Sequence, residues 1–170
     1  MDTDGFFQII DRHAVAKLKE FHYRAAGNED AALLAGEQAA DLAVAGEVLL
    51  WEYRTGRKVP RVHRHLRFHD HAKVEGRFGP HSVELPEPKT VMECAGLLAQ
   101  THAAYWQRQT RVQTLKKMIK DGGPDVAHFE KEFVAEQRQI DLCNEVRNRL
   151  IQAGDILLAD LLAEVRQVAL

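Results

Sequence analysis

The sequence predicts an all-α protein, an antiparallel four-helix bundle with long third and fourth helices. Apolar residues recur at steps of three and four along four segments, the spacing that lines one face of an α-helix. The connections within the first pair of segments and within the last pair are short, which favours antiparallel neighbours. A chain of 170 residues fits one domain, so we expect residues 1–170 to share a single core.

The first two helices are predicted over residues 6–25 and 29–54. Gly27 ends the first apolar stripe, and Asn28 is a suitable N-cap for the second helix. The second helix has one face of larger apolar residues, which we expect to be buried. The residues expected to form this buried stripe are Leu33, Ala40, Val44, Val48 and Trp51.

The third helix is predicted from about Pro88 to the stop signal DGGP, with nearly heptad spacing. The fourth is predicted to begin at Pro124 and to keep its stripe through Val165. A helix of about forty residues would span roughly 60 Å, unless Gly154 bends or breaks it. Because such a helix is longer than one domain and leaves apolar surface to cover, we expect a homo-oligomer.

Residues 56–87 are predicted to form an irregular crossover between the second and third helices. They include HRHLRFHDH, in which a helix would place His65 and His69 one turn apart, able to hold a divalent metal ion with Asp70. A strand would instead align the histidines with basic residues and bind an anionic small molecule, more strongly as the pH falls through about 6.5. The simplest interpretation is a solvated basic surface with no cofactor.

The overall composition is that of an ordinary globular protein. The chain is 45% hydrophobic with a formal net charge of -2, so nucleic acid and anionic membranes are not expected partners. Cys94 and Cys143 lie in apolar helical patterns and are interpreted as reduced core residues. No export signal or membrane-spanning segment is recognised, so we expect a cytoplasmic protein.

Several polar residues fall on the apolar faces of the predicted helices. An ionised Arg or Glu in an apolar core is costly unless it is paired and hydrogen-bonded, so these residues should contact one another. We therefore predict that Glu37 or Asp41 pairs with Arg147. The full predicted cluster comprises Glu37, Asp41, His102, Gln109, Asp141, Asn144, Arg147 and Asn148.

Three interpretations of this cluster are open. It can fix the register of the helices, form a ligand or catalytic pocket between them, or leave Arg147 extending to the surface. The Glu-x-x-His pairs of ferritin-like metal sites are absent, as are Gly-rich phosphate loops and serine nucleophile motifs. The pattern favours a binding or assembly protein. The alternative is a hydrolase or ligand-binding enzyme that uses the cluster, with a divalent metal held by the crossover.

The segment QRQIDLCNEVRNRLIQAGD, residues 137–155, resembles the signature KRxIDxxNQxRNDxIExID of an uncharacterised family of small bacterial all-helical proteins. That family also carries an NxxLWxxED element. Here LLAQTHAAYWQRQT keeps Trp106 but has His102 at the Asn position and Gln109 at the Glu position. The resemblance lies within the C-terminal half of the chain and covers only part of it. It implies a helical fold with a polar cluster between the third and fourth helices, and no known reaction.

Overall fold

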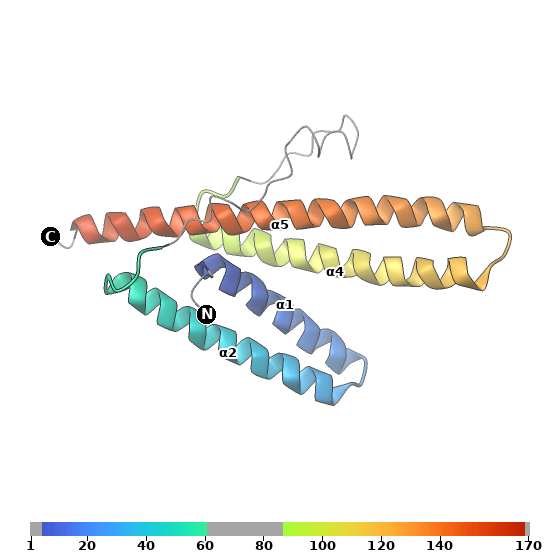
Figure 1. Cartoon of the computed structure of the whole chain (residues 1–170), viewed down its shortest axis with the longest axis horizontal. Helices are drawn as coiled ribbons and strands as arrows, with labels where there is room; N and C mark the ends of the chain where they lie inside the picture. Colours follow the sequence, from blue (N-terminus) through green and yellow to red (C-terminus); the bar gives the residue numbers. More distant parts are fainter. Residues whose placement is uncertain (1–4, 61–86, 169–170) are drawn as a thin grey trace.

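The computed structural model describes residues 5–60 and 87–168, which form four α-helices and no strand (Figure 1). The all-α bundle predicted from the sequence is confirmed. The helices are α1 (Phe6–Ala25), α2 (Glu29–Arg54), α4 (Val91–Asp121) and α5 (Val126–Val168).

The bundle consists of two antiparallel hairpins rather than four equivalent helices. α1 packs along α2, and α4 packs along α5. The two hairpins meet chiefly through α1, which contacts both α4 and α5, while α2 lies on the far side of α1 (Figure 1). α2 is therefore the helix with the least contact to the second hairpin.

The helix ends follow local sequence signals. The Asn28 side chain accepts a hydrogen bond of 3.2 Å from Ala31 N, which confirms Asn28 as the N-cap of α2. Thr90 is the N-cap of α4, because its side chain accepts a hydrogen bond of 3.1 Å from Glu93 N. Pro88 therefore precedes the helix and is not its first residue. α4 ends at Gly122, whose φ of 77° favours glycine because a Cβ is strained there.

α5 runs for 43 residues without a break, a length of about 65 Å. Gly154 neither bends nor interrupts it. The ring of Phe7 from α1 lies against Gly154 so closely that a Cβ at this position would overlap it. The glycine is therefore explained by the close approach of α1, and Phe7 is fully buried at that contact.

α2 buries the face opposite to the one predicted. Its buried residues are spaced by three, four or seven positions and so share one face of the helix: Ala32, Ala35, Ala39, Gly46, Leu49 and Tyr53. These positions lie about half a turn away from Leu33, Val44, Val48 and Trp51, which are exposed. The prediction for this face was wrong because the smaller side chains allow α1 to pack close to α2, as the contact of Phe6 with Gly46 illustrates.

The main core lies where the beginning of α1 meets α5 and the beginning of α4. Phe7, Leu98 and Leu150 are fully buried there, and Leu49 and Tyr53 join them from the end of α2. This region anchors the first hairpin on the second. The rest of the α4–α5 hairpin extends beyond it as a two-helix arm (Figure 1).

Candidate functional site

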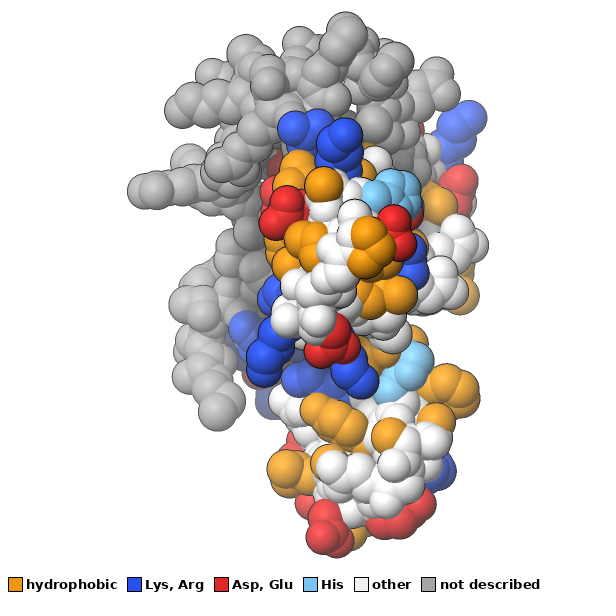
Figure 2. Space-filling view, turned by 90° about the vertical axis from the view of Figure 1, so that its right-hand side faces the viewer, with side chains coloured by type: hydrophobic (Ala, Val, Ile, Leu, Met, Phe, Trp, Pro, Cys, Tyr) orange, Lys and Arg blue, Asp and Glu red, His pale blue; other side chains and the backbone are white. Residues whose placement is uncertain are grey.

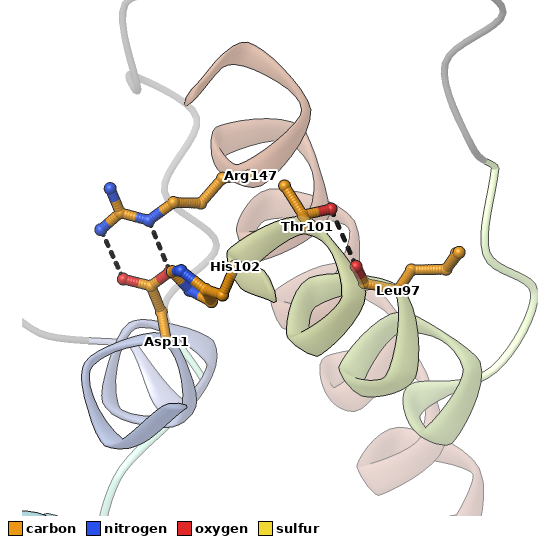
Figure 3. A network of polar contacts seen from close by, with 5 residues as sticks. All are labelled: Asp11, Leu97, Thr101, His102 and Arg147. Atoms are coloured by element: carbon orange, nitrogen blue, oxygen red, sulfur yellow. Dashed lines mark hydrogen bonds and ion pairs between the residues drawn. The ribbon is translucent and has the colours of Figure 1, made fainter. Parts of the chain in front are cut away.

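Three charged or titratable side chains from three helices meet beside this core (Figure 3). Asp11 lies on α1, His102 on α4 and Arg147 on α5. The guanidinium of Arg147 donates two hydrogen bonds to Asp11, from Nε to Oδ1 at 2.6 Å and from Nη2 to Oδ2 at 2.5 Å. His102 Nε2 lies 2.8 Å from Asp11 Oδ1. We call these three residues the polar cluster, and Asp11 is its centre.

Asp11 favours its ionised form although it is largely removed from water. Asp11 is only 2% exposed, and burial by itself would raise the pKa of its carboxyl group. The hydrogen bonds from Arg147 and His102 outweigh burial and hold the pKa of Asp11 below its ordinary value. The hydrogen bonds that Arg147 donates to Asp11 raise the pKa of Arg147. The Arg147 side chain is 36% exposed, so one edge of the cluster reaches solvent.

Residues along α4 extend the polar cluster toward the surface. Gln109 Nε2 donates a hydrogen bond of 3.0 Å to the hydroxyl of Tyr105, one turn earlier on the helix. Trp106 faces α1, where its ring stacks on His22 with centroids 4.5 Å apart. This side of α4 therefore holds α1 by both ionic and aromatic contacts.

The carboxylate that meets Arg147 differs from the predicted one. Glu37 and Asp41 are both exposed on α2, which α1 separates from α5. The predicted pairing with Glu37 or Asp41 was therefore wrong, because both residues lie on the face of α2 that points away from α1. Of the predicted residues, the structure brings together His102 and Arg147, whereas Gln109 donates to Tyr105 instead.

The remaining predicted residues lie around α5 or outside the described chain. Asp141 is exposed, and Asn144 and Asn148 are half-buried. Among the described residues, no hydrogen bond joins these three to the polar cluster. The predicted metal ligands His65, His69 and Asp70 lie outside the described residues.

Sequence reasoning missed Asp11 although a signal was present. Asp11 lies one turn after Phe7 and one residue after Ile10, within the apolar stripe of the first helix. It is thus a carboxylate on an apolar face, the same feature that identified His102 and Arg147. The same feature therefore marks Asp11 as a member of the cluster.

A second buried acid fixes the beginning of α1. Asp155 of α5 accepts a hydrogen bond of 3.1 Å from Phe7 N, which is among the backbone groups that an α-helix leaves unpaired at its start. A Cβ at Gly5 would lie 2.5 Å from Asp155 Oδ2, so the approach requires glycine. The negative charge also suits the positive end of the helix dipole. Asp155 and the polar cluster thus hold α1 at two points one turn apart.

An open apolar surface covers the outer face of α2. We call it the outer stripe and define it as Leu33, Val44, Val48 and Trp51, which are 64%, 61%, 52% and 48% exposed. Arg57 lies over the Trp51 ring, 4.3 Å from its centroid. Figure 2, which looks onto the ends where the hairpins turn, shows hydrophobic side chains on the surface of the α1–α2 hairpin in the lower part of the view.

Comparisons of the chain with family models, with curated proteins and with solved structures found no match. The resemblance to the uncharacterised helical family therefore stays a prediction. Within the described residues, no three His, Cys, Asp or Glu side chains are grouped so that they could hold a metal ion. No helix among those residues has the length and apolar character needed to cross a membrane.

Proposed function

We propose that this protein is a cytoplasmic binding or assembly protein and that the outer stripe of α2 is its interaction surface. The main support is that α2 has two opposite apolar faces: α1 covers the inner face, and the outer stripe is open. Large exposed apolar patches on globular proteins typically mark sites of protein–protein contact. Trp51 adds a residue type that is enriched among the strongest contributors to binding at interfaces.

In this proposal the polar cluster positions the hairpins and does not bind a substrate. Both carboxylate oxygens of Asp11 already accept hydrogen bonds from Arg147 and His102, which leaves little capacity for a ligand. The alternative of a hydrolase or ligand-binding enzyme has less support for this reason. The metal of that alternative would be held by His65, His69 and Asp70, which lie outside the described residues.

The proposal can be tested by placing a photo-crosslinking amino acid at Val48 in the full chain, expressed in its native host. We expect a discrete crosslinked protein band from this position. The matched control is the same crosslinker at Met92, an apolar residue that is 80% exposed and lies on a different helix, at the beginning of α4. Absence of a crosslink at Val48, or identical products from both positions, would contradict the proposal.

A further inference from the structure

The charges on α2 are divided along its length. The first half of the helix is acidic, and every charged residue from its start to Asp41 is an acid: Glu29, Asp30, Glu37 and Asp41. The second half of α2 and the residues just after it carry both signs: Glu47 and Glu52 are acids, and Arg54, Arg57 and Lys58 are bases. Lys58 pairs with Glu52 at 2.8 Å, so Arg54 and Arg57 give this end a small excess of positive charge. The outer stripe therefore has a strongly acidic end and a weakly basic end.

We propose that the partner of the outer stripe is a second copy of this chain, with the two α2 helices packed antiparallel about a twofold axis. This inference rests on the proposed function and names its partner. Antiparallel pairing places the acidic half of each helix beside the basic end of the other. With the axis between Val44 and Val48, Val44 of one copy then lies opposite Val48 of the other.

Charge is also what selects this arrangement over the other pairings of the same surface. A parallel pair would set the two acidic halves side by side, and like charges in contact across an interface are unfavourable. The acidic half likewise disfavours the surface of an anionic membrane. A twofold pair buries the same patch on both chains, so it covers the central part of both stripes at once and closes the assembly.

Sedimentation velocity of the purified full chain over a wide range of concentrations tests whether it pairs with itself. We expect a dimer for the wild type and a monomer for Val48→Lys, which should keep its helical circular dichroism because Val48 is already exposed in one chain. Met92→Lys is the matched control and should remain a dimer. A wild type that is monomeric throughout, or a Val48→Lys protein that still dimerises, overturns the inference.

Charge reversal tests the antiparallel orientation. The double change Glu37→Lys with Asp41→Lys, and separately Arg54→Glu with Arg57→Glu, should each raise the dissociation constant of the dimer by about tenfold or more. All four changes in one chain should restore the dimer, because the acidic and basic ends have then exchanged places. In a parallel pair each double change would only exchange one pair of like charges for another, so the dissociation constant would change little; that outcome would overturn the proposed orientation.

The two tests separate the inference from the proposed function. A monomeric wild type that crosslinks through Val48 to a different protein would remove self-pairing and leave α2 as an interaction surface. A monomeric wild type with no specific crosslink at Val48 would remove both.

Discussion

The polar cluster and the outer stripe of α2 reverse the usual distribution of side chains in opposite ways. At the polar cluster, an ionised Asp11 is buried, and the cost of its burial is offset by Arg147 and His102. At the outer stripe, large apolar side chains are exposed, with no covering element among the described residues. The comparison teaches that a buried charge or an exposed apolar surface indicates a compensating contact. For Asp11 that contact lies within the chain. For the outer stripe we propose that a second copy of the chain provides it.

The largest effect is expected from breaking the polar cluster. Arg147→Met removes two hydrogen bonds from a buried carboxylate and should lower the free energy of unfolding by about 3 kcal/mol. This value is at the lower end of the range for breaking a buried ion pair, because Arg147 is partly exposed. Adding Asp11→Leu should recover part of the loss, since no charge is then stranded. Urea denaturation measures the free energy of unfolding of the single and of the double variant. A cost for Arg147→Met no greater than that of a surface substitution would contradict this account of the cluster.

A smaller loss is expected where α1 approaches α5. Gly154→Ala would place a Cβ in the space of the buried Phe7 ring, and overpacking of this kind should lower stability by about 2 kcal/mol. Gly96→Ala on α4 is the matched control, because no side chain or other segment among residues 5–60 and 87–168 lies within 4 Å of a Cβ there. That change should stabilise the protein by about 0.5 to 1 kcal/mol through helix propensity. Thermal unfolding of the two variants should therefore shift in opposite directions.

The polar cluster should also make the free energy of unfolding depend on pH. Burial raises the pKa of Asp11, but the stronger combined effect of Arg147 and His102 lowers it, so the folded state favours the ionised form. The stabilisation is present above the ordinary pKa of 3.8 and is lost as the pH falls below it through the folded-state pKa. Asp11→Asn should thus be less stable than the wild type at neutral pH, and the difference between their free energies of unfolding should become smaller at acidic pH. A gap that stays constant down to the acid transition would show that Asp11 does not contribute in this way.

The smallest effect is expected at Glu37, which the sequence suggested as a partner of Arg147. Glu37→Leu removes a charge from the exposed outer face of α2 and should change stability by no more than about 0.5 kcal/mol. Chemical denaturation at a protein concentration where the chain is monomeric would measure it. A loss comparable to that of Arg147→Met would mean that Glu37, rather than Asp11, compensates the guanidinium.

The positions of the four helices were determined by the sequence alone, because helix formation depends on the spacing of apolar residues and on local caps such as Asn28. His102 and Arg147 could be recognised as buried polar residues for the same local reason. The tertiary structure alone decided which carboxylate pairs with Arg147, since Asp11 lies 136 residues away along the chain. It also decided which face of α2 is buried: both faces are apolar, and close packing against α1 selects the one with small side chains.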